Sequence, residues 1–228
     1  MKILSWNVNQ HKDCSDLMDI INTLQDHHSE VMFLHDFLND RQGQIIRNTM
    51  KELGWEYQYF TGIGSTSGIL ILSSNHFSLS RCNYRKPSKS YGWLDILFDD
   101  CRMSILAVHI PKNDRYINSG EYWERLLEYT KIKTVDDCLI LGTLCPEEMK
   151  PVSQQPQSIK EIMKTGWIDL IQHYQGRTET NWVDGNTALR MDYAFASRMV
   201  KEFVSTAYIS KTEREKGFSR PAIVLELM

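Results

Sequence analysis

The stretch from residue 2 to residue 8, KILSWNV, decides how the chain begins. Its side chains alternate in character, which predicts a β-strand that starts the core of the protein. Residues 31–34, VMFL, form a continuous apolar run, and such runs suit strands that are buried on both faces. The N-terminal part of the chain therefore predicts strands of a buried sheet.

Apolar residues at helical spacing predict helices over residues 15–26, 39–53, 119–135 and 157–165. Further strand-like segments follow the first two: 56–60, 68–73, 77–83, 92–98, 102–109, 138–141, 189–197, 202–210 and 221–227. This mixture of hairpins and helical crossovers predicts an α/β fold with two mainly antiparallel sheets packed together and helices outside. The proline-containing stretch 146–157 is expected to be a mobile surface loop.

The composition excludes several classes of protein. A chain of 228 residues, with 42% hydrophobic and 24% charged residues, suits one large globular α/β domain over residues 1–228. The net charge of −3 argues against a protein that coats nucleic acid by charge alone. A local basic patch stays open, and its candidate members are Lys86, Lys89, Lys112, Arg115, Arg190 and Arg198.

The cysteines and the apolar runs predict where the protein resides. The five cysteines are odd in number, widely spaced and without a CxxC pair, which favours reduced thiols. No apolar run has the length of a membrane span, and the N-terminus lacks the apolar region of a signal peptide. We therefore expect a cytoplasmic protein without membrane contact.

Seven short segments occur in an order that points to a known family. They are ILSWNVN (3–9), VMFLHD (31–36), SGILILS (67–73), AVHIP (107–111), LILGTLC (139–145), RMDYAFAS (190–197, after Trp182) and GFSRPAIVL (217–225). These segments resemble the motifs of the endonuclease/exonuclease/phosphatase superfamily, which includes DNase I-like and exonuclease III-like enzymes. The resemblance covers nearly the whole chain. It implies a four-layer α-β-β-α sandwich and metal-dependent hydrolysis of phosphate esters.

The resemblance assigns two residues to a metal site. Asn7 matches an asparagine of the metal shell, and Asp36 replaces a metal-binding glutamate with a side chain one methylene shorter. Mg²⁺ or Mn²⁺ is then expected to bind weakly or not at all. Two plainer interpretations stay open: Asn7 caps the turn after the first strand, and Asp36 caps the helix that follows it.

Four more residues match functional positions of the superfamily. His109 corresponds to the histidine that contacts the scissile phosphate, and Asp192 to the aspartate that orients that histidine or the metal. Arg190 and Trp182 are expected to bind substrate. The alternatives are a structural histidine and a plain ion pair between Arg190 and Asp192.

The differences from the superfamily matter more than the matches. Thr143 stands where an aspartate would activate water, and Cys145 where an asparagine would hold the phosphate. Threonine is no carboxylate base, and cysteine is a poor substitute for a carboxamide. The closing Asp-His pair is missing: either it is deleted before Arg220-Pro221, or Phe218 and Ser219 occupy its positions.

Catalytic groups of this kind act as a unit, and removal of one of them already removes most of the activity. We therefore expect hydrolysis to be lost or very weak. The sequence then favours a degenerate relative whose cleft binds a phosphorylated ligand, a nucleic acid or a protein partner. Two alternatives stay open: an active metal-dependent nuclease or phosphatase with a rearranged site, and a purely structural or interaction protein. The sequence leaves the ligand, the protein partner and the oligomeric state open.

Overall fold

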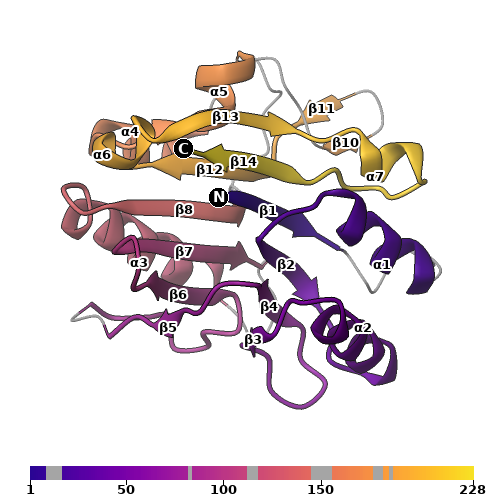
Figure 1. Cartoon of the computed structure of the whole chain (residues 1–228). Coiled ribbons are helices and arrows are strands. Elements are labelled where there is room, and N and C mark those ends of the chain that lie inside the picture. The colour runs from indigo at the N-terminus through magenta and orange to yellow at the C-terminus, as the bar shows by residue number, and fades with distance from the viewer. Residues whose placement is uncertain (9–16, 82–83, 112–117, 145–155, 177–181, 185–186) are drawn as a thin grey trace.

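The structure of the chain is a computed structural model that describes residues 1–8, 17–81, 84–111, 118–144, 156–176, 182–184 and 187–228. Two six-stranded sheets form its centre (Figure 1). The first sheet has the order β13 (Val204–Ile209), β14 (Ile223–Leu227), β1 (Lys2–Asn7), β2 (Val31–Phe37), β4 (Gly68–Ser73) and β3 (Tyr57–Phe60). The second has the order β5 (Ser78–Leu79), β6 (Trp93–Phe98), β7 (Met103–Ile110), β8 (Cys138–Leu144), β12 (Asp192–Ala196) and β9 (Ile168–Asp169).

Each sheet is mixed. Within the described strands, β1 runs parallel to β2 and β7 runs parallel to β8, whereas the other neighbouring strands run antiparallel. A small antiparallel ribbon of β10 (Trp182–Asp184) and β11 (Thr187–Leu189) projects beside them. The two parallel pairs lie at the centres of their sheets, where both faces are covered.

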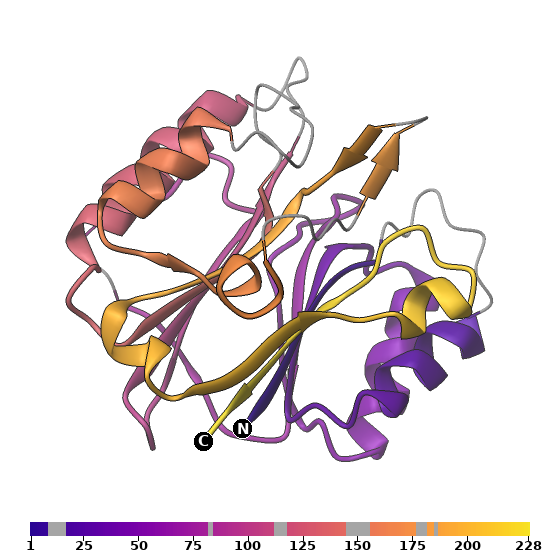
Figure 2. The same ribbon diagram turned by 90° about the horizontal axis from the view of Figure 1, so that it is seen from above.

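Helices cover the outer faces of both sheets (Figure 2). On the first sheet lie α1 (Leu17–Asp26) and α2 (Arg41–Glu52), whose apolar sides join Leu4, Trp6 and the outward residues of β2 and β4 in one cluster. On the second sheet lie α3 (Ser119–Ile132) and α4 (Gln157–Lys164). The four-layer α-β-β-α sandwich expected from the sequence is confirmed.

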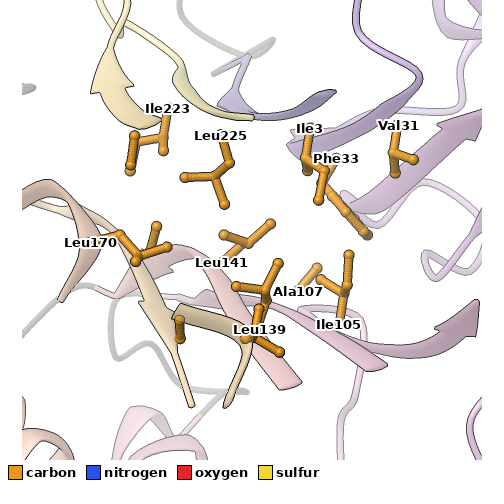
Figure 3. Close-up of a cluster of buried hydrophobic side chains, with 14 of the residues drawn as sticks. Ile3, Val31, Phe33, Ile105, Ala107, Leu139, Leu141, Leu170, Ile223 and Leu225 are labelled. Atoms are coloured by element: carbon orange, nitrogen blue, oxygen red, sulfur yellow. The ribbon is translucent and has the colours of Figure 1, made fainter. Parts of the chain in front are cut away.

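The inner faces of the two sheets form the main core (Figure 3). Alternation along each strand decides which side chains enter it: Ile3 of β1 points inward, whereas Leu4 joins the cluster under α1 and α2. The same rule places Leu141 of β8 inward and Ile140 outward. Gly142, which follows Leu141, has a φ of +138°, and a Cβ there would meet the carbonyl oxygen of Val108 at 2.0 Å, so only glycine fits.

Most of the elements expected from the sequence are present, with small shifts at their ends. The strand expected over 77–83 is reduced to β5 in the described residues. Three short helices were not predicted: α5 (Leu170–Gln175), α6 (Arg198–Lys201) and α7 (Thr212–Glu215). The loop expected over 146–157 falls mainly outside the described residues. Among the helices that the structure describes, none has the length and apolar character needed to cross a membrane.

Truncating Leu141 to alanine tests the core between the sheets. Leu141 is 0% exposed, so Leu141→Ala should lower the free energy of unfolding by about 2–5 kcal/mol in a denaturant titration. Leu79→Ala is the control, because Leu79 is 45% exposed and its truncation should change stability by less than about 0.5 kcal/mol. Equal effects of the two substitutions would contradict the placement of the core.

Candidate functional site

At one end of the sandwich, the inward positions of the central strands change from apolar to polar. In β1, the inward residues after Ile3 are Ser5 and Asn7, two and four positions further along. In β7, Ala107 is followed by His109, and in β8, Leu141 is followed by Thr143. The alternation that builds the apolar core therefore also directs these polar side chains into the space between the sheets.

The strand registers bring the polar residues of each sheet side by side. In the first sheet, Asn7 lies opposite His35. In the second sheet, Thr143 lies opposite both His109 and Asp192, on its two sides. The sequence-predicted residues Asn7, His109, Thr143 and Asp192 thus converge on one site.

A continuous chain of hydrogen bonds joins the two sheets at this site. Asn7 donates from Nδ2 to Oγ1 of Thr143 at 2.9 Å, and Thr143 donates to Oδ1 of Asp192 at 2.5 Å. The other carboxylate oxygen of Asp192 accepts from Nη2 of Arg220 at 2.5 Å. The four side chains are buried, so these bonds satisfy polar groups that water does not reach freely. We call Asn7, Thr143, Asp192 and Arg220 the inter-sheet network.

Arg220 enters the site through the packing of the segment before β14. Nε1 of Trp6 donates to the carbonyl oxygen of Arg220 at 2.8 Å, and the ring of Phe218 packs edge-on against Trp6 at 4.9 Å. Arg220 is 7% exposed. Phe218 is buried in the core under α1 and α2, and Ser219 is exposed. The residue of this segment that reaches Asp192 is therefore Arg220, which the sequence motifs did not assign to the site.

Asp36 lies on an irregularity of β2. The register between β2 and β4 shifts after Leu34, and Asp36 has a φ of +55°, a conformation that aspartate tolerates better than most residues. Its carboxylate accepts from Oγ of Ser67 at 2.7 Å. The alternative in which Asp36 caps the next helix is wrong, because Asp40 caps α2 by accepting from the backbone N–H of Gly43.

Two histidines border the inter-sheet network. His35 is fully buried and shares a hydrogen bond of 2.9 Å between its Nε2 and Oγ of Ser5. Burial, followed by the charges of His109 and Arg220, holds the pKa of His35 well below its ordinary value. The pKa of His109 is lowered too, chiefly by burial, although Asp36 and Asp192 counteract part of the effect of burial and of Arg220. Both imidazoles are therefore neutral near neutral pH.

Arg190 makes a different ion pair from the one considered above. Its guanidinium donates two hydrogen bonds to Asp169, at 2.6 and 2.7 Å, and lies 4.4 Å from the centre of the Tyr193 ring. The alternative of a side-chain ion pair with Asp192 is wrong, since Arg190 reaches only the backbone oxygen of Asp192. The remaining predicted residues are less informative: Trp182 begins β10 and its side chain is not described, and Cys145 lies outside the described residues.

Asp192 does not fit the role of a Mg²⁺ or Mn²⁺ ligand. Such ions take oxygen ligands in octahedral geometry, usually one or two carboxylates together with water and substrate phosphate. Both oxygens of Asp192 accept hydrogen bonds from Thr143 and Arg220, and the guanidinium repels a second cation. In the part of the chain that the structure describes, no group of three or more histidine, cysteine, aspartate or glutamate residues could hold a metal ion. Asp192 is thus committed elsewhere and does not join Asp36 and Asn7 in such a site.

A second buried pair anchors the segment that carries Arg220. His27, which follows α1, forms a hydrogen bond of 2.5 Å from Nε2 to Glu213 of α7. Burial acts to raise the pKa of Glu213, but the hydrogen bond and the charge of His27 outweigh it and hold that pKa below its ordinary value. This contact ties α7, and with it the chain leading to Phe218 and Arg220, to the helices on the first sheet.

Comparison with solved structures shows what the architecture resembles. An AP endonuclease from Archaeoglobus fulgidus superposes with a TM-score of 0.77 at 15% sequence identity, over 100% of this chain and 99% of that one. A 3′ phosphatase from Neisseria, solved with a product DNA hairpin, gives 0.73 at 16% identity, and a 3′-5′ exonuclease from Neisseria meningitidis gives 0.72 at 16%. Both of these alignments cover 100% of this chain and 99% of the Neisseria chain.

No family model matches the sequence, and no curated protein matches it significantly. The structural neighbours are nucleases and a phosphatase of the DNase I-like superfamily. The likeness establishes the DNase I-like fold of the chain, as the sequence motifs predicted, whereas fold alone does not decide activity.

Replacing Glu213 by glutamine tests the anchor. Near neutral pH, Glu213→Gln should lower the free energy of unfolding by about 1–3 kcal/mol, because the buried His27 loses a charged acceptor. A carboxylate with a lowered pKa contributes stability above its unfolded-state pKa and loses it as the pH falls through the folded-state value. The difference between wild type and variant should therefore shrink as the pH falls below the ordinary pKa of a glutamate and through the lower pKa of Glu213 in the folded protein.

Denaturant titrations at several pH values measure this difference. Glu215→Gln is the matched control, since Glu215 lies on the same helix and is exposed. A destabilisation of Glu213→Gln that stays constant down to the acid limit would show that the charge of Glu213 has no part in the anchor.

Proposed function

We propose that this protein is a non-hydrolytic or weakly active relative of the DNase I-like nucleases, and that its cleft binds nucleic acid or another phosphate-bearing ligand. The observation that carries the proposal is the inter-sheet network, in which Asp192 is held by Thr143 and Arg220. A residue that is fixed by a threonine hydroxyl and a guanidinium on its two oxygens is poorly placed to bind a metal or to orient a base.

The described residues of the cleft also lack a strong general base. The hydroxyl of Thr143 donates its proton to Asp192, and arginine does not lose its proton in proteins. Burial lowers the pKa of His109, which makes its imidazole a weaker base, and the carboxylate of Asp192 is already bonded to Thr143 and Arg220. The missing proton-transfer groups, more than the missing metal ligands, argue for a ligand-binding role.

We propose that basic residues of the segment before β6, here called the rim segment, contribute to the binding of a phosphate backbone. Arg85 and Lys86 are exposed. The segment lies against α3, where Ser88 bonds to Glu121, and it leads to Gly92, which accepts a hydrogen bond from the backbone of His109. Lys89 lies in the same segment, where its carbonyl oxygen accepts from Tyr122 of α3. Cations in this position favour a polyanion through counterion release.

The remaining candidates for the basic patch differ in their positions. Arg190 is paired with Asp169, and Arg198 begins α6, which follows the end of β12 opposite Asp192. Lys112 and Arg115 lie outside the described residues. The rim segment 85–89 is therefore the part of the patch on which the proposal relies.

Two alternatives are tested by the same experiments. Retention of Asn7, Asp36, His109 and Asp192 in the sequence favours an active phosphodiesterase or phosphatase with a rearranged site, for which Mg²⁺ or Mn²⁺ would be the metal and Asp36 its carboxylate ligand. Close packing of Phe218 against Trp6 favours a structural role with a protein partner. We further propose one domain over residues 1–228 and a cytoplasmic location, which the free thiols of Cys101 and Cys138 support.

Hydrolysis should be absent or very slow. We expect no metal-dependent turnover of supercoiled plasmid, single-stranded RNA or a chromogenic phosphate diester with Mg²⁺ or Mn²⁺, because a positioned base is missing. Gel and absorbance assays of the purified protein measure this, with Asp192→Ala as the companion variant. Robust turnover that requires the metal and disappears in Asp192→Ala would overturn the proposal in favour of the active enzyme.

Nucleic-acid binding should depend on salt and on the rim. Fluorescence anisotropy with a labelled single-stranded oligonucleotide should give a Kd that rises with salt concentration. Arg85→Gln/Lys86→Gln should reduce the logarithmic salt slope by about 1 for each phosphate that the variant no longer neutralises. Lys164→Gln on α4 is the control, because Lys164 is exposed and pairs with Glu161 on the outer layer. Identical affinities of the three proteins would exclude the rim segment as the binding surface.

A further inference from the structure

Arg220 carries more hydrogen-bond donors than the described residues use. An arginine has five N–H donors. Nη2 bonds to Asp192, and Nη1 lies 3.8 Å from the weak acceptor Sδ of Met191. Its Nε is buried and has no hydrogen-bond partner among the residues that the structure describes. Because a buried donor without an acceptor costs about 1–3 kcal/mol, this guanidinium is suited to a further acceptor.

Two imidazole nitrogens around the same network are in a similar state. Nδ1 of His35 and Nδ1 of His109 are buried and, within the described part of the chain, have no hydrogen-bond partner. The unused polar atoms thus come from three separate elements: β2, β7 and the segment before β14. Arg220 bonds to Asp192, His109 lies opposite Thr143, and His35 lies opposite Asn7, so all three residues adjoin the inter-sheet network.

We propose that Arg220 is the resident cation of the cleft, and that its unused N–H groups, together with His109, bind a phosphate oxyanion without a metal ion. This inference rests on the proposed function, since it names the group that would recognise the phosphate-bearing ligand. A planar guanidinium is the side chain best matched to phosphate oxygens, and partial burial strengthens its hydrogen bonds. Nη2 of Arg220 donates to Asp192, and the remaining N–H groups of the guanidinium donate to the phosphate oxygens of the ligand.

The charges in the cleft set the strength of this binding. Arg220 compensates one of the two carboxylates, Asp36 and Asp192, and the neutral imidazoles add no charge. Directional N–H donors, supported by Arg85 and Lys86 at the rim, must therefore supply the affinity. We expect modest, salt-sensitive binding that divalent cations do not enhance.

The first experiment uses the wild-type protein. Anisotropy with a fluorescent single-stranded oligonucleotide is recorded in EDTA and in Mg²⁺, and the Kd in EDTA should be the same as in Mg²⁺ or lower. A complex that forms only with Mg²⁺ would overturn the resident-cation inference while leaving nucleic-acid binding intact. Failure of the oligonucleotide to bind under any condition would instead overturn the proposed function.

The second experiment tests the cleft with inorganic phosphate. Phosphate in EDTA should raise the midpoint of thermal unfolding of the wild type, because a ligand that binds the folded state stabilises it. This readout is independent of oligonucleotide binding. Absence of a rise beyond that given by chloride at equal ionic strength would overturn the inference even if nucleic acid binds at the rim.

Variants of Arg220 identify the donor. Arg220→Lys keeps the positive charge but loses the planar set of N–H donors of the guanidinium. It should therefore weaken oligonucleotide binding in EDTA about tenfold, equivalent to about 1.4 kcal/mol. Arg220→Met/Asp192→Asn removes both partners, so that no uncompensated charge stays buried if Arg220→Lys fails to fold. Arg125→Met is the matched control: Arg125 pairs with Glu128 on α3 and also has a buried Nε without a partner among the described residues. The inference would be overturned if both Arg220 variants bound the oligonucleotide in EDTA with the same Kd as Arg125→Met.

Discussion

The ion pair between Asp192 and Arg220 is the interaction on which the rest of the site depends. A carboxylate that is 3% exposed must be compensated by a nearby cation or by several donors, since an isolated buried charge is very costly. In this chain the compensation comes from a side chain, so it is permanent and needs no dissociable ion. Thr143 then serves Asp192 as a donor, and Asn7 in turn donates to Thr143, which extends the compensation from one sheet to the other.

This network also explains why the two sheets stay in register at their polar end. Over most of the sandwich, apolar residues such as Ile3, Phe33 and Leu141 hold the sheets together without directional bonds (Figure 3). At the inter-sheet network this apolar packing gives way to the bond from Asn7 to Thr143, which is directional. Polar groups that would otherwise loosen the sandwich thereby become specific contacts between its halves.

The sequence predicted the fold well because the signals were long and repeated. Strands such as β4 and β8 are buried at every position, and the helices α2 and α3 show a clear apolar side. The helices that were missed, α5, α6 and α7, have 6, 4 and 4 residues, too few for a periodic pattern to emerge. Their positions are set by tertiary contacts, as the anchor between His27 and Glu213 illustrates for α7.

The site was predictable only as far as strand alternation reaches: Asn7, His109 and Thr143 occupy inward positions at the ends of recognisable strands, so their convergence follows from the fold. Arg190 is close to Asp192 in sequence, but it packs with Tyr193 on the outer face of the second sheet, where it meets Asp169.

The position of Arg220 depends on interactions that no local pattern records. They are the path of a turn, the bond from Trp6 to the Arg220 carbonyl and the packing of Phe218. The resemblance predicted that an Asp-His pair is missing from this segment, but it did not point to Arg220 as the residue that reaches Asp192. The same guanidinium that compensates Asp192 also keeps an Nε donor without a partner among the described residues, so one side chain accounts both for the stability of the buried carboxylate and for the proposed binding of an anion.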